Sequence, residues 1–206
     1  MLNQPYIGFE GPIGAGKTTL AQLLAAHLGA ILILEDVDGN EFLSDFYGDK
    51  QRWSLGMQLS FLVSRHQQLA GVARSPRPRS VVADYIYAKD GIFARKLLQG
   101  RELSLYSRIS SGLRSNVAQP DLVIYLDADN DVLLERIKRR KRDYEKSIDR
   151  EYLESVRDSY AKYFSSDLDV RFIRFDTSAL SLASESELGT LYRTITAAYS
   201  GGVAVK

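Results

Sequence analysis

A glycine-rich stretch near the amino terminus has the spacing of a loop that cradles phosphate. EGPIGAGKTT, residues 10–19, follows the apolar run YIGF and precedes LAQLLAAHL, so we expect it between a strand and a helix. Small residues let successive backbone N–H groups curl around phosphate oxygens, and the positive end of the helix faces the same place. The pattern G-x-x-x-x-G-K-[ST] therefore predicts binding of a nucleoside triphosphate. The expected phosphate contacts are Gly11, Gly14, Ala15, Gly16, Lys17, Thr18 and Thr19.

Acidic residues end three of the predicted strands: Glu35 follows ILIL, Asp84 follows VVA and Asp127 follows LVIYL. Ligands of open parallel sheets collect outside the carboxyl ends of the strands. A carboxylate there can hold Mg²⁺, directly or through water, beside the Thr18 hydroxyl, or it can take the proton of an attacking hydroxyl. Lys17 is expected to reach the β and γ phosphates. The alternative for each acidic residue is a solvated carboxylate without a catalytic role, the favoured interpretation for Asp127.

A run of cations lies late in the chain, within ERIKRRKRDYEKSIDREYLESV, residues 135–156. Five consecutive cations, Lys138 to Arg142, would repel one another on an ordinary helix, so an anion is expected to face them. A solvated helix face and a nucleic-acid patch are alternatives. We favour a flap that closes over the triphosphate, because Arg136 and Arg140 share a helix face and Arg142 can reach round from its end. Arginines that arrive on closure would stabilise the charge on a phosphoryl group in transfer.

Polar side chains recur on one face of the helix predicted for SLGMQLSFLVSRHQQL. Gln58 and Arg65 are seven residues apart, which places them on the same face and about 10 Å apart along the axis. An amide supplies both a donor and an acceptor, and a guanidinium supplies a planar fork, as the edge of a nucleobase requires. The alternative is that Arg65 merely pairs with a nearby carboxylate.

Short apolar runs alternate with longer amphipathic stretches, which predicts an α/β fold with a parallel sheet. Several runs are apolar at successive positions, as in strands that helices cover on both faces. We expect one domain over residues 1–206, a loop at 74–80 and a tail after Ser200. The predicted strands are 6–9, 30–34, 80–84, 121–127 and 170–176. The predicted helices are 17–28, 54–69, 89–98, 103–116, 130–140, 149–164 and 185–199.

The composition excludes several classes of protein. The formal net charge is only +1, so the totals do not suggest a protein that coats nucleic acid or an anionic membrane. The absence of cysteine excludes disulfides, thiolate metal sites and cysteine nucleophiles. No apolar run approaches the ~18 residues that cross a bilayer. We expect a cytoplasmic protein that binds neither membrane nor nucleic acid.

Several motifs in order resemble the deoxynucleoside kinases, in particular the bacterial deoxyguanosine and deoxyadenosine kinases. They are EGPIGAGKTT, LEDV, FYGDKQRWSLGMQLSFLVSRHQQL, DYIYAKDGIFA and RIKRRKRDYEKSIDREYLESV, which together run from Tyr6 to about Tyr163. The resemblance implies a three-layer P-loop fold like that of the nucleoside monophosphate kinases, with a parallel five-stranded sheet and an Arg-rich lid at about 137–148. It also implies transfer of the γ-phosphate of ATP to the 5′-hydroxyl of a deoxynucleoside, with Mg²⁺, by a homodimer.

The resemblance assigns roles to individual residues. Glu35 would accept the proton of the 5′-hydroxyl, although EDV stands where the family usually has EPV. Asp84 and Thr18 would hold Mg²⁺. The residues implied at the nucleoside are Tyr47 and Glu145 on the sugar 3′-hydroxyl, Met57 on the wall of the site, Gln58, Arg65 and Asp90 at the base edge, and Phe93 on the base face. The lid arginines would be Arg136, Arg140 and Arg142.

One departure from the family pattern follows the third strand. The family usually has an acidic residue followed by Arg-Ser, and this chain has Asp84, Tyr85 and Ile86. Lys89 or a lid arginine would then supply the missing charge. The D-Y-x-x-x-K version resembles bacterial deoxyguanosine kinases, which favours purine deoxynucleosides, although guanine, adenine and cytosine all offer mixed donors and acceptors.

Two other classes remain as alternatives. Thymidylate kinase, another P-loop enzyme, has an acceptor that is already a phosphate and should carry more cations near the acceptor pocket. A regulatory NTPase would not need Gln58, Arg65 and Tyr47 in the arrangement expected here. The sequence contains neither the N-K-x-D motif nor the L-S-G-G-Q signature.

Overall fold

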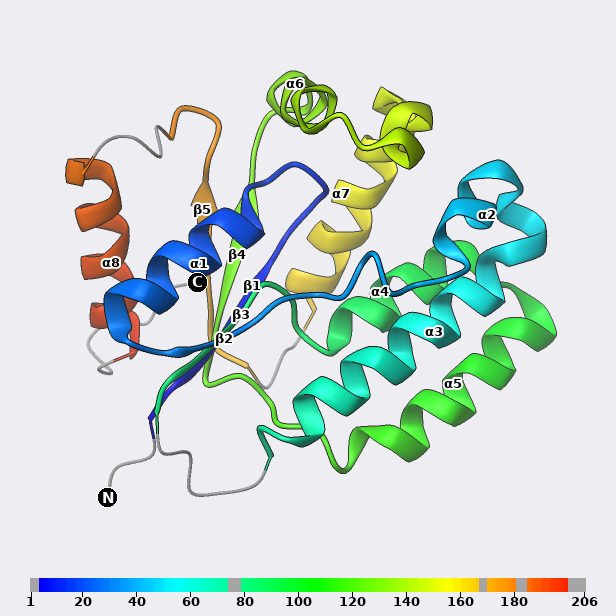
Figure 1. Cartoon of the computed structure of the whole chain (residues 1–206), viewed down its shortest axis with the longest axis horizontal. Helices are drawn as coiled ribbons and strands as arrows, with labels where there is room; N and C mark the ends of the chain where they lie inside the picture. The colour runs from blue at the N-terminus through cyan, green and yellow to red at the C-terminus, as the bar shows by residue number, and fades with distance from the viewer. Residues whose placement is uncertain (1–3, 74–78, 167–169, 181–184, 200–206) are drawn as a thin grey trace.

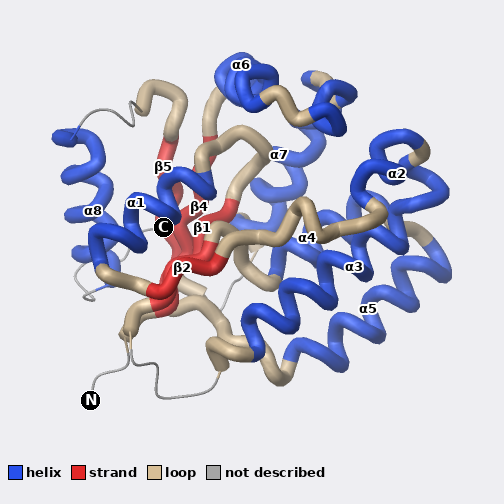
Figure 2. The backbone as a smooth tube through the Cα atoms, viewed as in Figure 1, coloured by secondary structure: helices blue, strands red, loops and turns tan. Residues whose placement is uncertain are grey.

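A parallel five-stranded sheet forms the centre of the molecule. The computed structural model describes residues 4–73, 79–166, 170–180 and 185–199. The strands lie in the order β2-β3-β1-β4-β5, and every neighbouring pair is parallel. Figure 2 shows the sheet at the centre of the molecule with helices around it. The bounds of the strands are β1 (Tyr6–Glu10), β2 (Ile31–Ile33), β3 (Val81–Ala83), β4 (Leu122–Asp127) and β5 (Phe172–Asp176).

Helices cover both faces of this sheet (Figure 1). On one face α1 (Lys17–Leu28) and α8 (Glu185–Tyr199) pack in one apolar cluster with β1 and β4. The opposite face is covered by α3 (Lys50–Ala70), α4 (Ala88–Leu97), α5 (Gly100–Arg114) and α7 (Arg150–Phe164). Every residue of β1, β3 and β4 is buried, which explains why their sequences are apolar at successive positions. The three-layer arrangement and the parallel sheet expected from the sequence are confirmed.

Shorter elements lie beyond the carboxyl ends of the strands. They are α2 (Leu43–Gly48), α6 (Asn130–Arg140) and the 3₁₀ helix η1 (Asp143–Ser147). Lys141, between α6 and η1, has a left-handed backbone with φ of 53°. The segment predicted to be a lid, 137–148, therefore consists of the end of α6, a tight turn and a 3₁₀ helix.

Some element boundaries differ from the prediction. Helix α3 begins at Lys50 rather than at residue 54, because the Asp49 side chain accepts a hydrogen bond from Arg52 N (3.1 Å) and starts the helix earlier. Helix α2 was not predicted, since six residues are too few to show a helical period. Helix α5 covers 100–114 instead of 103–116. Residues 74–78 of the predicted loop and the predicted tail after Ser200 lie outside the described residues.

The helices that the structure describes include none with both the length and the apolar character needed to cross a bilayer. The longest of them, α3, spans 21 residues but carries charged side chains such as Lys50, Arg52 and Arg65.

Gly11 joins β1 to the phosphate loop in a conformation that suits only glycine. Its φ is +145°, and a Cβ there would lie 2.1 Å from the carbonyl oxygen of Leu126 on β4. We expect Gly11→Ala to lower the free energy of unfolding by about 2–4 kcal/mol, through backbone strain and overpacking. Urea denaturation measures the change. The control is Gly112→Ala, inside α5. A Cβ at Gly112 would meet no heavy atom within 4 Å, so this change should not destabilise the protein. Equal stability of the two variants would contradict this account of Gly11.

Candidate active site

A large cavity opens at the carboxyl ends of the strands. Its volume is about 1110 Å³, more than the ~300–1,000 Å³ typical of a site for one small molecule. The phosphate loop forms one end, and residues of α3 and α4 form the other. Side chains of α6 and η1 also line it. The cavity can therefore hold two ligands face to face.

The phosphate loop has the geometry that its sequence predicts. Gly16 precedes the first turn of α1 with φ of +95°, so the loop turns directly into the amino end of that helix. Gly14 has φ of +89°, and a Cβ there would lie 2.8 Å from the carbonyl oxygen of Leu133 on α6. Lys17 Nζ donates to the carbonyl oxygens of Gly11 (2.7 Å) and Pro12 (2.9 Å). The structure brings the predicted loop residues together on the cavity wall: Gly11, Gly14, Ala15, Gly16, Lys17, Thr18 and Thr19.

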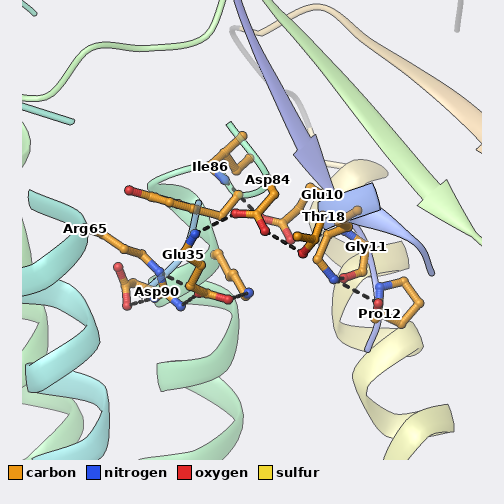
Figure 3. A network of polar contacts seen from close by, with 12 residues as sticks. Glu10, Gly11, Pro12, Thr18, Glu35, Arg65, Asp84, Ile86 and Asp90 are labelled. Atoms are coloured by element: carbon orange, nitrogen blue, oxygen red, sulfur yellow. Dashed lines mark hydrogen bonds and ion pairs between the residues drawn. The ribbon is translucent and has the colours of Figure 1, made fainter. Parts of the chain in front are cut away.

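The two predicted magnesium ligands are in direct contact. Thr18 Oγ1 donates to Asp84 Oδ2 (2.6 Å), and Asp84 Oδ1 accepts from the backbone N–H of Glu35 (2.7 Å) (Figure 3). A hydroxyl and a carboxylate are oxygen ligands of the kind that Mg²⁺ prefers. Within the described part of the chain no group of three or more His, Cys, Asp or Glu could hold a metal ion. These two residues therefore fit a magnesium ion that takes its other ligands from phosphate and water.

Glu35 lies in the middle of the cavity with both carboxylate oxygens paired to cations. Arg65 donates from Nε (3.0 Å) and Nη2 to Oε1, and Lys89 Nζ donates to Oε2 (2.6 Å). The same guanidinium donates from Nη1 to Asp90 Oδ1. Because Lys89 and Asp90 are neighbours on α4, these contacts close a ring, the Glu35 ring, made of Glu35, Arg65, Asp90 and Lys89. Burial alone would raise the pKa of Glu35, but Lys89 and Arg65 hold it well below its ordinary value.

The predicted base-reading residues meet at the far end of the cavity. Gln58 and Arg65 both line it, as their spacing on α3 predicts. Gln58 Oε1 is buried without a hydrogen-bond partner among the described residues, and Nε2 has only Met57 Sδ at 3.7 Å. The Arg65 guanidinium lies 4.7 Å from the ring centroid of Phe61 and 5.7 Å from that of Tyr85. Phe61, which the sequence suggested was a core residue, thus supports a side chain of the site. Met57 and Phe93 complete this wall.

Asp90 occupies a different place from the other predicted base readers. It is 1% exposed, and it is not among the described residues that line the cavity. Burial raises the pKa of Asp90 to about 6, although the neighbouring Arg65 opposes the shift. The geometry gives Asp90 contact with Arg65 rather than with the cavity. Arg65 pairs with carboxylates, as the alternative interpretation expected, and it also lines the cavity, while its contact with a base stays a prediction.

The residues expected at the sugar gather near η1. Tyr47 stacks on Tyr144 with ring centroids 5.7 Å apart, and it lines the cavity together with Glu145. Glu145 is 6% exposed, and its Oε1 lies 3.2 Å from Arg140 Nη2 and 3.8 Å from Arg142 Nη1. Its Oε2 has no partner among the described residues. Two predicted lid arginines thus adjoin one predicted sugar ligand.

Arg136 is separate from these two arginines. Its guanidinium donates to the hydroxyl (3.0 Å) and the carbonyl oxygen (2.6 Å) of Thr177, just after β5. The Thr177 hydroxyl in turn lies 3.1 Å from the carbonyl oxygen of Ala15 in the phosphate loop. Arg136 and Arg140 both line the cavity, as a shared helix face predicts, but they contact different residues, Thr177 and Glu145.

Asp127 is not a solvated carboxylate. It is 5% exposed and accepts hydrogen bonds from Arg157 Nε (3.0 Å) and Arg174 Nη2 (2.7 Å). Burial would raise the pKa of Asp127, but the two arginines outweigh it and lower the pKa. The favoured interpretation was therefore wrong about the surroundings. Asp127 is not among the described residues that line the cavity, and its absence from the site stays a prediction.

Sequence reasoning missed several residues of the site. Tyr144, Tyr160 and Thr177 line the cavity, and nothing in their spacing predicts this. Glu10 is fully buried beside the phosphate loop. Burial raises the pKa of Glu10, with Lys89 and Lys17 opposing. An acidic residue at the end of an apolar strand, directly before the first loop glycine, was the available signal for Glu10.

Comparison with known proteins matches nearly the whole chain. The family model described as "Deoxynucleoside kinase" matches residues 7–195. A deoxyguanosine kinase of Bacillus subtilis is 38% identical over 162 residues, which cover 78% of this chain and 78% of the relative. A deoxyadenosine kinase of Dictyostelium discoideum is 35% identical over 167 residues, which cover 79% and 67%.

Solved structures show the same fold at lower sequence identity. A deoxyadenosine kinase from M. mycoides, solved with dCMP and a flexible dCDP, is 23% identical and superposes with a TM-score of 0.81. The match covers 93% of this chain and 99% of that one. The same enzyme with bound dATP also gives 0.81 and covers 94% and 100%.

Lys89 makes a testable contribution to the Glu35 ring. Because the folded pKa of Glu35 lies below its ordinary value of 4.5, the ionised carboxylate stabilises the fold above that pH and loses this effect as the pH falls. We expect Lys89→Gln to lower the free energy of unfolding by about 3 kcal/mol at pH 7. The deficit should shrink as the pH falls below the ordinary value of 4.5, because protonation of Glu35 in the variant removes the charge that lacks Lys89.

Denaturant unfolding at several pH values measures this deficit. Lys96→Gln is the control on the same helix: Lys96 contacts Ser155 and no carboxylate of the ring, so a small and pH-independent change is expected. A deficit for Lys89→Gln that stays constant from pH 3 to pH 8 would contradict the assignment.

Proposed function

Since the chain belongs to the deoxynucleoside kinase family, we propose that it transfers the γ-phosphate of ATP to the 5′-hydroxyl of a purine deoxynucleoside in nucleotide salvage. The observation that carries the proposal is the position of Glu35. Its buried carboxylate lies in one cavity with the phosphate loop and with the polar face of α3. A proton acceptor between a triphosphate site and a base-reading site is what this transfer requires.

Phosphate binding is proposed for the loop and Lys17. Backbone N–H groups and the amino end of α1 would surround the phosphates, and Lys17 would leave the carbonyl oxygens of Gly11 and Pro12 to reach the β and γ groups. Thr18 and Asp84 would hold Mg²⁺, which neutralises charge between the phosphates when it is bound. Arg136, fixed by Thr177, would face the phosphate end of the cavity.

Glu35 is proposed to orient the 5′-hydroxyl and to take its proton late in the transfer. A carboxylate with so low a pKa is a weak base, which suits a reaction whose transition state needs little proton removal from the attacking oxygen. Arg65 and Lys89 fix both oxygens, so the attacking hydroxyl meets an acceptor whose position is already set.

Sugar and lid contacts complete the proposed site. Tyr47 and Glu145 would bind the 3′-hydroxyl, because the unpartnered Oε2 of Glu145 is available as an acceptor. Arg140 and Arg142 flank the same carboxylate and would turn to the transferred phosphoryl group when the lid closes. As the resemblance implies, the proposal includes a homodimer and a cytoplasmic location.

A purine is proposed as the base for two reasons. Gln58 offers an unpartnered acceptor and Arg65 offers N–H donors, a combination that suits the mixed donors and acceptors of guanine and adenine, although cytosine shares them. The Bacillus subtilis relative at 38% identity is a deoxyguanosine kinase, which favours deoxyguanosine over deoxyadenosine. Thymidylate kinase is disfavoured as an alternative, because Arg65 and Lys89 at the acceptor end are neutralised by Glu35 and Asp90.

Initial rates with a panel of acceptors test the substrate class. We expect deoxyguanosine and deoxyadenosine, at fixed Mg-ATP, to give higher kcat/KM than deoxycytidine and thymidine, because the relatives at 38% and 35% identity are a deoxyguanosine kinase and a deoxyadenosine kinase. Chromatography of the nucleoside monophosphate measures the product. Phosphorylation of thymidine monophosphate but of no nucleoside would favour thymidylate kinase. ATP hydrolysis without a phosphorylated nucleoside would favour an NTPase.

Replacing Glu35 tests the proton acceptor. Glu35→Gln keeps the size of the side chain and removes its charge, so we expect kcat to fall about 10²- to 10⁴-fold while the Kd of the nucleoside changes little. Steady-state rates and calorimetric binding separate the two quantities. Glu41→Gln, an exposed carboxylate on the same connection between β2 and α2, is the matched control. Near-normal kcat in Glu35→Gln would show that another group accepts the proton.

A further inference from the structure

Glu10 is a buried carboxylate for which the proposed mechanism has no use. It ends β1 and is 0% exposed. Its Oε1 accepts from the backbone N–H of Gly11 (3.1 Å) and from the hydroxyl of Tyr160 (2.8 Å). Its Oε2 accepts from the backbone N–H of Ile86 (3.3 Å) (Figure 3). All three partners are donors, so both oxygens of the Glu10 carboxylate act as acceptors.

The three donors come from three parts of the site. Gly11 is the first residue of the phosphate loop, where the donor triphosphate would bind. Ile86 lies in the turn between β3 and α4, two residues after Asp84 and three before Lys89. That turn places Lys89 against Glu35, at the acceptor end. Through two backbone hydrogen bonds, Glu10 therefore connects the first residue of the phosphate loop to the turn before α4.

Tyr160 extends this connection to α7, the helix that follows η1. Its ring meets Phe93 edge-on, with centroids 6.2 Å apart, and stacks on Tyr125 at 6.0 Å. The ring also lines the cavity. The hydroxyl contact with Glu10 joins residues 150 positions apart in the sequence. Packing on both sides holds the ring in one orientation, and its hydroxyl therefore fixes where the Glu10 carboxylate lies.

We infer that Glu10 is a positioning residue whose carboxylate, held by Tyr160, fixes the start of the phosphate loop relative to the turn that leads into α4 and Lys89. This sets the separation between the transferred phosphorus and the hydroxyl bound at Glu35. The inference rests on the proposed function. Since a shift of about 1 Å between reacting groups can cost 10²-fold in rate, a contact that never touches substrate can still control kcat.

Rates of Glu10→Gln and Tyr160→Phe test this assignment. An amide at position 10 places an N–H against one of the three donors, so we expect kcat to fall about 30-fold, with KM for ATP and for the nucleoside within about threefold of the unmodified protein. Tyr160→Phe removes one hydrogen bond and should lower kcat about fivefold. The double variant should resemble Glu10→Gln alone, because the hydroxyl acts through the carboxylate.

Tyr163→Phe is the matched control, one turn further along α7. The described residues that donate to the Glu10 carboxylate are Gly11, Ile86 and Tyr160, and Tyr163 is not one of them, so kcat should not change. All rates are expressed per folded molecule, from the fraction folded at the assay temperature. A purely structural role would lower the melting temperature and leave kcat per folded molecule unchanged.

The inference would be overturned if kcat of Glu10→Gln were within twofold of that of the unmodified protein. It would also be overturned if the losses of kcat in the two single variants multiplied in the double variant. Equal losses of kcat in Tyr160→Phe and Tyr163→Phe would overturn it as well. If Glu10→Gln does not fold, the comparison of kcat per folded molecule between Tyr160→Phe and Tyr163→Phe decides whether the inference holds. The unmodified protein is assayed alongside. If it makes no deoxynucleoside monophosphate, the proposed function fails and the inference with it, whereas product formation with unchanged variants rejects the inference alone.

Discussion

The pairing of Glu35 with two cations is the interaction on which the site depends. A carboxylate inside a cavity is costly unless its charge is neutralised and its oxygens accept hydrogen bonds. Arg65 and Lys89 meet both requirements, and Asp90 in turn balances Arg65. These groups come from α3, α4 and the segment after β2, so the ring fixes the relative positions of three elements. Any repacking of α3 against α4 would leave a buried charge without its partner.

This constraint explains why α3 buries both apolar and polar side chains. The helix is apolar where it packs, with Leu62 and Leu69 at 0% exposure, yet it also buries Gln58 and Arg65. The polar pair lies on the cavity side, one above the other. Phe61 serves both demands, since its ring belongs to an apolar cluster and also lies against the Arg65 guanidinium. A guanidinium stacked on an aromatic ring holds its N–H donors in one plane, and a planar hydrogen-bonding ligand requires donors in that plane.

Local patterns predicted the parts of the molecule that local physics determines. The phosphate loop, the five strands and the shared face of Gln58 and Arg65 depend on neighbours within one or two turns, and the structure confirms their placement. The partners of charged groups lie far away in sequence and could not be predicted: Glu35 meets Arg65 across 30 positions, and Glu10 meets Tyr160 across 150. The role of each residue in catalysis stays a prediction, because geometry places side chains without measuring rates.

The departure at Tyr85 now has a physical account. The family pattern leads one to expect an arginine there, and its loss would leave Glu35 with one cation fewer. Lys89, four residues later and the second residue of α4, supplies that charge through its contact with Glu35 Oε2. Tyr85 makes different contacts, because its hydroxyl donates to Gln68 and its ring lies beside the Arg65 guanidinium. The exchange keeps the charge balance of the Glu35 ring and adds an aromatic surface next to Arg65. A site can thus lose a residue typical of its family and still preserve the electrostatic arrangement, provided that another element presents the cation to the same oxygen.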